Sequence, residues 1–550
     1  MSAWWRALAL WRQFEKAQRL PIVRSCRQLS PIVNDHDIGA LMFQPLDHLT
    51  QRGDPQSIAL TGKFGAIDYA TMEAMTGRLA HWLAAHGLAP GSRIAAWLPK
   101  GIVAAMLPLA VARAGHVYVP INPLLKRAQV AHIMADSGAL MLISQPSRLA
   151  LLQPEDLIAA VTVEEAQLST VMEASDGRAL GPSAANVDDL VEILYTSGST
   201  GRPKGVMLSH ANLMIGARSV ASYLGLAADD RALAVLPMSF DYGQNQFLAS
   251  WWAGASVVPL DYLLPRDVAK AAATYCVTTL AGVPPLWIQL TEIDWSSEAV
   301  ASLRRITNTG GALTRPLIAK LRHIFPNVDI FAMYGLTEAF RSTFLPPHML
   351  AAHPDSIGRA IPDAEILVIG PDGALTQDDE PGELVHCGPL VAQGYWRDTE
   401  RTAERFRPAP AASRYGGTAV WSGDTVVRDA QGLLRFVGRD DAMIKSAGNR
   451  ISPGEIEDAA VAVAGVAEAC ALGVPDERLG QAILLYIRAD AALCETDEQA
   501  LMDRLRAALR QDLPNFMQPA SILILQDLPR NPNGKIDRVA LARMAQGTSV

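Results

Sequence analysis

Apolar positions along the chain repeat with two periods, one of about 3.6 residues and one of two. In the first part, helix-like stretches at Tyr69–His86 and Ile102–Ala114 are interleaved with short apolar runs at Arg93–Leu98 and Tyr118–Ile121. Regular exchange of helix and strand is typical of α/β layers built on parallel sheets. We therefore predict an α/β fold for the larger, N-terminal part of the chain.

The pattern changes towards the C-terminus. Short alternating runs such as Glu365–Ile369 and Gly382–Cys387 are separated by turns, which predicts a β-rich section. After it, helical stretches such as Pro453–Ala464 again mix with strand-like runs, and this mixture predicts a small α+β domain. The organisation that we predict is an N-terminal extension at residues 1–40, a large domain at 41–438 and a small C-terminal domain at 439–550.

Composition narrows the classes of protein that the chain can belong to. With 550 residues, 49% of them hydrophobic, it exceeds one ordinary domain. The net charge of -8, with Lys and Arg scattered among acids, argues against a nucleic-acid partner. No apolar run reaches the roughly 20 residues that a membrane span needs. The five cysteines are dispersed, which fits a reducing compartment without a metal site, and we expect a cytoplasmic protein.

The first 40 residues differ from the rest. Trp4, Trp5, Trp11 and Phe14 lie among several arginines, with few acids. One interpretation is an amphipathic helix that touches a membrane surface or a partner. The other, which we favour, is a poorly ordered extension. The segment lacks the apolar region and cleavage site of a secretory signal.

A glycine-rich loop follows the strand-like run Leu190–Leu194. Its glycines allow backbone N–H groups to face an anion, its hydroxyls can donate to phosphate oxygens, and Lys204 adds a positive charge. The spacing is not that of a Walker A loop. The alternative is a mobile surface loop, since Ser/Thr/Gly strings are common in linkers. The loop residues expected at the phosphates are Thr196, Ser197, Gly198, Ser199, Thr200 and Gly201.

Five further motifs follow in order. Thr309–Ala312 is a Gly-Gly turn, and Met333–Glu338 brings a ring, a tight turn, a hydroxyl and a carboxylate together. The others are Trp421–Asp424, Gly438–Asp441 and the turn Asn531–Asp537. Together with the loop, these motifs resemble the adenylate-forming (AMP-binding) superfamily, which includes acyl-CoA synthetases, amino-acid adenylation domains and luciferases. The resemblance extends from about residue 43 to about residue 540.

The resemblance implies an ATP site and Mg²⁺. Glu338 would ligate the metal, which prefers oxygen ligands, and Thr337 would donate to a phosphate. Lys535 would lie between the attacking carboxylate and the α-phosphate, where a cation stabilises developing charge. Lys204 is the fourth residue expected to take part in catalysis. The remaining nucleotide contacts implied are Gly310, Gly311, Tyr334, Asp424 and Arg439.

The resemblance also implies a second half-reaction. The small domain would rotate about Asp441, withdraw Lys535 and bring Lys445 and Gly448 towards an incoming pantetheine thiol. Because the chain ends shortly after Lys535, we expect a separate acceptor, either coenzyme A or a small carrier protein with phosphopantetheine.

The identity of the acid depends on residues outside the nucleotide motifs. Phe240-Asp241 matches the pattern of amino-acid-activating relatives, in which the Asp pairs with the substrate ammonium group. The alternative is that Asp241 caps a helix beginning near Gly243. Arg341 could bind an acidic group on the substrate or neutralise Asp241. By resemblance, the acid pocket consists of Phe240, Asp241, Tyr242, Asn245, Gly282, Thr307, Thr309, Met333, Arg341 and Ser342.

The sequence thus predicts an AMP-forming acid–thiol ligase, with an amino acid favoured over a simple acyl substrate. Its overall likeness is to stand-alone ligases of exosortase and exopolysaccharide gene neighbourhoods and to stand-alone prolyl-carrier-protein ligases. The alternative is an acyl-CoA synthetase for a non-amino acid. A non-catalytic nucleotide-binding scaffold and a luciferase-like oxygenase are remoter hypotheses, and the presence of Lys535, Glu338 and the loop glycines argues against the scaffold.

Overall fold

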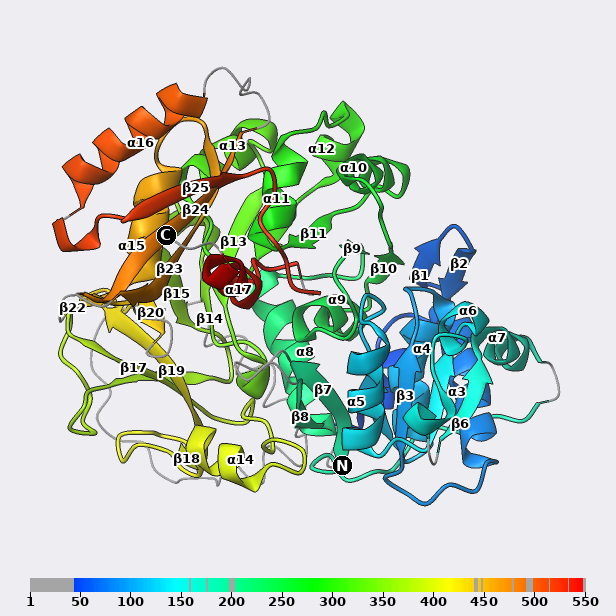
Figure 1. Cartoon of the computed structure of the whole chain (residues 1–550). Helices are drawn as coiled ribbons and strands as arrows, with labels where there is room; N and C mark the ends of the chain where they lie inside the picture. Colours follow the sequence, from blue (N-terminus) through cyan, green and yellow to red (C-terminus); the bar gives the residue numbers. More distant parts are fainter. Residues whose placement is uncertain are drawn as a thin grey trace, which may run out of the picture. The chain divides into compact units, whose positions relative to one another are not determined.

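The structure is a computed structural model. It describes residues 44–157, 160–174, 177–196, 203–439, 444–446, 449–476, 479–490, 498–513, 515–532 and 534–547. The described residues form three sheets, which Figure 1 shows with their helices. The predicted N-terminal extension lies outside the described residues.

The first sheet is the α/β layer predicted for the N-terminal part. Its strands are β3 (Arg93–Trp97), β4 (Val117–Pro120), β5 (Met141–Ser144), β6 (Val161–Glu164), β7 (Leu190–Thr196) and β8 (Lys204–Ser209). Their order is β6-β5-β3-β4-β7-β8, and all pairs except the antiparallel β7–β8 hairpin are parallel. The associated helices are η1 (Leu46–Gln51), α3 (Tyr69–Ala84), α4 (Ile102–Arg113), α5 (Arg127–Ser137), α6 (Pro146–Leu149), η2 (Pro154–Leu157) and α7 (Glu165–Glu173).

The second sheet joins parallel and antiparallel parts. Its parallel strands are β1 (Ile58–Gly62), β9 (Arg231–Ala234), β10 (Ser256–Pro259), β11 (Thr279–Gly282), β12 (Arg305–Asn308) and β13 (Asp329–Tyr334). Its antiparallel strands are β2 (Gly65–Asp68), β14 (Thr343–Leu345), β15 (Ser356–Ala360), β16 (Glu365–Ile369), β17 (Pro381–Cys387), β18 (Phe406–Pro408), β19 (Thr418–Arg428) and β20 (Leu434–Arg439). The predicted β-rich section is thus an antiparallel continuation of an α/β sheet, because β13 pairs with β14 and β15 with β20.

The helices of this second layer connect its strands. They are α8 (His210–Leu224), α9 (Asp241–Trp252), α10 (Pro265–Thr274), α11 (Pro284–Thr291), α12 (Ser297–Ser302), α13 (Arg315–Ile324), η3 (Thr337–Ala339), η4 (Pro347–Met349) and α14 (Thr399–Arg405). The site residues discussed below lie mostly on α9, at the ends of β12 and β13, and in the segment after β13. This is the expected place for a ligand in an open α/β sheet, where the carboxyl ends of the strands meet.

The third sheet is built from the C-terminal residues. Its elements are β21 (Ile444–Ser446), β22 (Asn449–Ile451), α15 (Pro453–Val461), β23 (Val466–Asp476), β24 (Gly480–Ala489), α16 (Glu498–Asp512), η6 (Asn515–Met517), β25 (Ser521–Leu525) and α17 (Arg538–Gly547). The path is β22-β21-β24-β23, with β25 beside β24. This is the small α+β domain that the sequence predicted.

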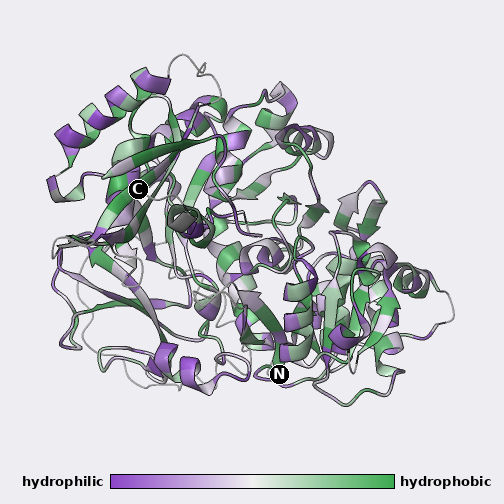
Figure 2. Cartoon of the chain, viewed as in Figure 1, coloured by the Kyte–Doolittle hydropathy of each residue, from purple (hydrophilic) through white to green (hydrophobic). Residues whose placement is uncertain are grey.

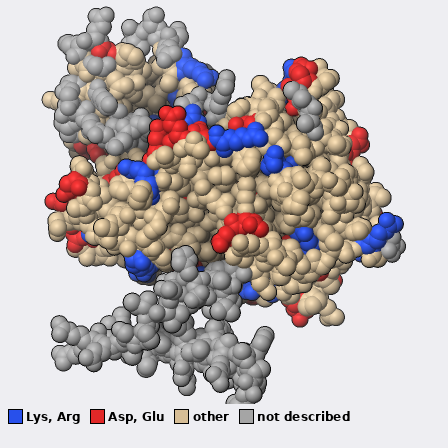
Figure 3. All heavy atoms as spheres, turned by 90° about the horizontal axis from the view of Figure 1, so that it is seen from below, with Lys and Arg blue, Asp and Glu red and all other residues tan. Residues whose placement is uncertain are grey.

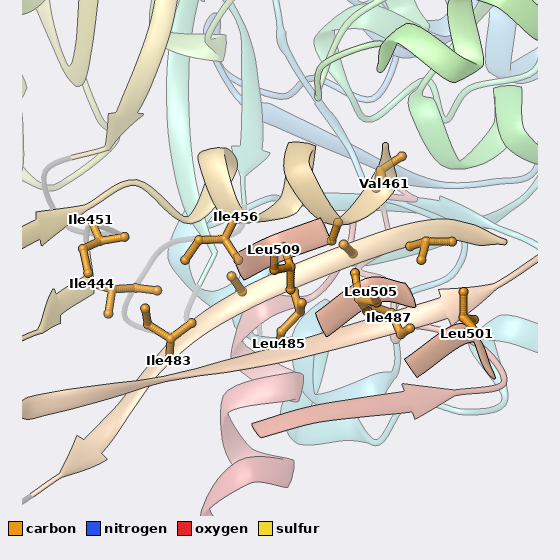
Figure 4. Close-up of a cluster of buried hydrophobic side chains, with 14 residues drawn as sticks. Ile444, Ile451, Ile456, Val461, Ile483, Leu485, Ile487, Leu501, Leu505 and Leu509 are labelled. Atoms are coloured by element: carbon orange, nitrogen blue, oxygen red, sulfur yellow. The ribbon is translucent and has the colours of Figure 1, made fainter. Parts of the chain in front are cut away.

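One face of the third sheet packs under α15 and α16 (Figure 4). Leu501, Leu505 and Leu509 recur every four residues along α16, which puts them on one side of the helix. They meet Leu485 and Ile487 of β24, which are fully buried like them. Burial of one such side chain contributes about 1.5–3 kcal/mol, so this stripe holds α16 on the sheet. Hydrophobic strands and striped helices recur through the chain in Figure 2.

The surface has the mixed charge that the composition predicted. On the face drawn in Figure 3, acidic and basic side chains of the described residues are interspersed. None of the helices in the described residues is both long enough and apolar enough to cross a bilayer.

Candidate active site

The β7–β8 hairpin brings the two ends of the glycine-rich loop together. Thr196 on β7 is in register with Lys204 on β8, so both flank the loop between them. The Thr196 hydroxyl is buried and has no hydrogen-bond partner among the described residues, as expected of a group that awaits a phosphate oxygen. The predicted contacts from Ser197 to Gly201 lie outside the described residues.

Lys204 and Glu338 meet in a cluster that includes a third residue, Tyr395. The Lys204 Nζ lies 3.0 Å from Oε1 of Glu338 and donates to the Tyr395 hydroxyl at 2.6 Å. That hydroxyl donates to Glu338 Oε1 at 2.5 Å. Burial would raise the pKa of Glu338, but the Lys204 charge and the Tyr395 hydrogen bond outweigh it, so the net pKa is lowered. Glu338 is therefore an ionised acceptor at neutral pH, as a magnesium ligand must be.

Tyr395 was missed by sequence reasoning. It reaches the cluster because residues 394–396 dock along β8, with a bridge between Val206 and Tyr395 and a hydrogen bond from Trp396 N–H to Gly205 O at 2.8 Å. The side chain is 3% exposed. A single tyrosine between β17 and β18 carries no periodic signal, so only the long-range pairing could reveal it.

A second pair connects the proposed base and ribose contacts. Tyr334, the last residue of β13, donates a hydrogen bond through its hydroxyl to Oδ2 of Asp424 on β19. Asp424 is in register with Arg439 at the end of β20. The three residues that we assigned to the nucleoside therefore lie on two adjacent strands and the end of a third. The side chain of Arg439 is outside the description.

The Gly310–Gly311 turn receives a side chain from the C-terminal domain. Gly310 has φ +82°, and a Cβ there would lie 2.7 Å from Cε of Lys535. The resemblance assigns these glycines to nucleotide contacts, and in this structure the Lys535 side chain also approaches Gly310. Lys535 is presented by a turn in which Asn531 N–H donates to Lys535 O at 2.8 Å. Asn122 in the large domain anchors that turn by donating to Pro532 O at 3.1 Å.

Asp241 is the first residue of α9, which follows the N-cap Phe240. The alternative that Asp241 caps a helix beginning near Gly243 is therefore wrong, since the helix begins two residues earlier. Asp241 is 4% exposed, and its carboxylate accepts a long hydrogen bond from Thr337 at 3.5 Å. Burial raises the pKa of Asp241, and the charges of Arg341 and Lys535 oppose that shift. The carboxylate is thus desolvated and weakly satisfied.

Five of the ten predicted pocket residues line one cavity of about 30 Å³, namely Tyr242, Asn245, Thr307, Met333 and Arg341. The others lie around it. The Phe240 ring centroid is 5.4 Å from Lys535 Nζ, and Gly282 leaves room for Trp287, whose ring a Cβ would meet at 2.7 Å. Thr309 is buried beside the glycine turn, and Ser342 faces away from the cavity towards Nδ1 of His386 at 3.0 Å.

The residues assigned to the hinge and to the thiol step are only partly described. Lys445 lies on β21 opposite Arg450 of β22. Asp441 and Gly448 lie outside the described residues. Within the described ranges, no group of three or more His, Cys, Asp or Glu side chains could hold a metal. The buried carboxylate of Glu338 offers the kind of oxygen donor that Mg²⁺ prefers.

The sequence matches the family described as AMP-binding enzyme over residues 49–396, and its C-terminal domain over residues 455–535. Tyrocidine synthase 3 of Brevibacillus parabrevis is 29% identical over 90% of the chain, which corresponds to 7% of that protein. Feruloyl-CoA synthase of an Amycolatopsis species is 31% identical, over 88% of the chain and 95% of that enzyme. The chain spans less than half the length of the peptide synthetases that it matches.

The fold is likewise shared with solved structures. ATP-bound MatB from Rhodopseudomonas palustris superposes with a TM-score of 0.80 and 26% identity, over 92% of this chain and 99% of that one. The large domain with its small C-terminal domain is the architecture of these enzymes. The chain therefore belongs to the AMP-binding enzymes, the adenylate-forming ligase family that its motifs predict.

Proposed function

We propose that the protein is an AMP-forming acid–thiol ligase acting in the cytoplasm. A substrate carboxylate oxygen attacks the α-phosphorus of ATP, the bond to the β-phosphate breaks, and pyrophosphate leaves with its electron pair. A pantetheine thiol of coenzyme A or a carrier protein then attacks the acyl carbon of the resulting adenylate, and AMP leaves as the carbon–oxygen bond breaks. Relatives named as peptide synthetases and as a CoA synthase support both acceptors.

The observation that carries the proposal is the position of Lys535. Its side chain passes over Gly310, and its Nζ is 5.4 Å from the ring centroid of Phe240. It therefore reaches the junction between the proposed nucleotide contacts and the proposed acid pocket. A cation there neutralises charge that develops as the carboxylate meets the phosphate.

The other residues take supporting roles in the first step. Lys204 would neutralise phosphate charge, and it is held by Glu338 and Tyr395. When Mg²⁺ is bound, it would be held by Glu338 and would neutralise charge on the phosphates. Tyr334 and Asp424 would hold the nucleoside, since a ring and a carboxylate suit an adenine and a ribose.

An amino acid is our preferred acid because of Asp241. Among the described residues, no Lys, Arg or His nitrogen lies within the 4.0 Å ion-pair limit of its carboxylate. A buried carboxylate without such a partner is costly, and a substrate ammonium group would supply one. An acyl substrate without an amino group is the second candidate, favoured by the match to feruloyl-CoA synthase over nearly its full length.

The test separates the two half-reactions. Wild-type protein should catalyse ATP–pyrophosphate exchange with some member of a panel of amino acids and short, aryl and fatty acids. Lys535→Ala should lose exchange by more than about 100-fold, the scale of removing one electrostatic group from a reacting centre. Thioester formation from a supplied adenylate should largely survive. Lys270→Ala, at an exposed position of α10, is the matched control and should retain both steps.

Two results would count against the proposal. If no acid supports exchange by the wild-type protein, carboxylate activation is wrong. If Lys535→Ala lowers both half-reactions equally, the lysine does not act in adenylation alone. Exchange with acyl acids and with no amino acid would leave the ligase intact but refute the assignment of Asp241.

A further inference from the structure

A strained turn follows the 3-10 helix η3. Phe340 has φ 61° and ψ -72°, and the N–H of Arg341 donates to Ala339 O at 2.7 Å, which closes a γ-turn. Such a backbone is strained for an aromatic residue and persists only where packing over-determines it. Two glycines make that packing. A Cβ on Gly216 of α8 would lie 2.3 Å from the Phe340 ring, and one on Gly335 would lie 2.9 Å from Cα of Arg341.

The turn directs Arg341 into the interior. The residue is 2% exposed, and its guanidinium carbon lies 4.8 Å from the ring centroid of Tyr242. Its Nε has no hydrogen-bond partner among the described residues. In the part of the chain that the structure describes, no carboxylate lies within 4.0 Å of the guanidinium. A desolvated cation is costly unless an anion pairs with it.

Neutralisation of Asp241 does not explain this arrangement. The two side chains affect each other only at longer range, since they form no ion pair within 4.0 Å. A pair retained for mutual neutralisation inside a protein would be in contact and hydrogen-bonded. Asp241 instead accepts from Thr337, and Arg341 lines the cavity together with Tyr223.

The cavity sets the size of the group that Arg341 could bind. Its volume is about 30 Å³. One enclosed water needs roughly 10–15 Å³ on this measure, so there is room for two or three non-hydrogen atoms. A carboxylate has three. Asn245, also on the cavity wall, carries a buried Oδ1 without a partner, and rotation of its amide would turn two donors to the same ligand.

We infer that the protein selects a short acid with a second carboxylate, which enters this cavity and pairs with Arg341 while the first carboxylate reacts near Lys535. The inference rests on the proposed ligase function and identifies its substrate class. With Asp241 as the ammonium partner, the class includes acidic α-amino acids. Arg341 is then a specificity-determining residue that touches the substrate away from the reacting atoms.

The experiment compares acids that differ only at the distal end. Pyrophosphate exchange is measured for succinate against butyrate, aspartate against 2-aminobutyrate, and glutamate against norvaline. For at least one pair, the acid with the second carboxylate should have a kcat/KM at least tenfold higher. Arg341→Met removes the charge at similar length and should lower that value by about 100-fold, mainly through KM, with the uncharged partner unaffected or improved. Arg341→Lys should retain an intermediate preference.

The matched control is Arg315→Met at the start of α13, where the side chain is 68% exposed. It should leave every kcat/KM value unchanged. The dicarboxylate should also raise the melting temperature of wild-type protein without ATP, and this shift should vanish in Arg341→Met. If Arg341→Met does not fold, the comparison of acids with wild-type protein and with Arg341→Lys still tests the inference.

Equal use of both members of every pair would overturn the inference while leaving the ligase proposal standing. The same conclusion would follow if Arg341→Met lowered kcat/KM equally for both acids of a pair. Absence of exchange with every acid would instead overturn the proposed function, and the inference with it.

Discussion

Gly216→Ala tests whether α8 holds the turn that carries Arg341. An alanine Cβ would approach three atoms of the Phe340 ring, at 2.3, 2.5 and 2.7 Å. Carbon atoms pack best at roughly 3.5–4.0 Å, so the ring must move by about 1 Å or more. Phe340 is 1% exposed, so the ring is surrounded by other residues. Overpacking of this kind costs about 1–3 kcal/mol.

Helix propensity acts in the opposite direction. Ala is favoured over Gly inside a helix by about 0.8–1.0 kcal/mol. Because the contacts at position 216 are far below van der Waals distance, we take the upper part of the overpacking range. The expected net result is a loss of about 1–2 kcal/mol in the free energy of unfolding, measured by urea titration. The KM of exchange for the preferred acid should rise as well, because the turn that directs Arg341 is displaced.

Gly181→Ala is the control, since a Cβ there meets nothing within 4 Å. It should be neutral or stabilising by up to about 1 kcal/mol. In the double variant Gly216→Ala/Phe340→Leu, the smaller side chain should relieve the clash, with a coupling energy of about 1 kcal/mol or more. If Gly216→Ala is as stable as Gly181→Ala and the double variant is additive, the packing argument is refuted.

Two further predictions concern buried carboxylates, those of Glu192 and Glu338. Burial raises the pKa of Glu192 on β7 to about 8, although Gln244 donates to it at 2.7 Å. In the unfolded chain the pKa of a glutamate is lower, about 4.3, so the folded state binds an extra proton at pH values between the two. The free energy of unfolding therefore falls as the pH rises from about 5 to 8, by up to about 1.4 kcal/mol per pH unit. Glu192→Gln should remove that slope in unfolding titrations at several pH values, and an unchanged slope would contradict the assignment. Tyr395→Phe should lower exchange by about 10- to 100-fold, because it removes a charge-assisted bond worth roughly 1.5–3 kcal/mol to Glu338. A change of less than twofold would exclude this positioning role.

Local elements could be predicted because each leaves a periodic trace in the sequence. The run Glu365–Ile369 alternates and is a strand with those same bounds. The leucines at 501, 505 and 509 predict the buried side of α16 for the same reason. The order of the strands in the sheets could not be predicted in this way. Nothing in the periodicity indicates that β13 pairs with β14 and so joins the parallel and antiparallel parts of the second sheet.

Contacts between distant residues were predictable only where a motif specified them. The resemblance assigned Gly310 and Gly311 to the nucleotide, but it gave no sign that the Lys535 side chain, far away in the sequence, approaches Gly310. Tyr395 reaches Glu338 through pairing along β8, which a pattern within one segment cannot encode. The strained Phe340 has no sequence signal either, because its conformation follows from the space that Gly216 and Gly335 leave.

The two sides of the candidate site differ in how well their charged groups are satisfied. On the nucleotide side, Lys204 is paired with Glu338, and Tyr334 with Asp424, so these groups are positioned before a ligand arrives. On the acid side, the Arg341 Nε has no hydrogen-bond partner among the described residues, and the Thr337 hydroxyl lies 3.5 Å from the Asp241 carboxylate. A protein tolerates such deficits where a ligand supplies the missing partners. On the nucleotide side the residues that pair with one another belong to motifs, so the motifs alone identify the nucleotide. On the acid side the charged groups without partners indicate which chemical groups the acid must carry.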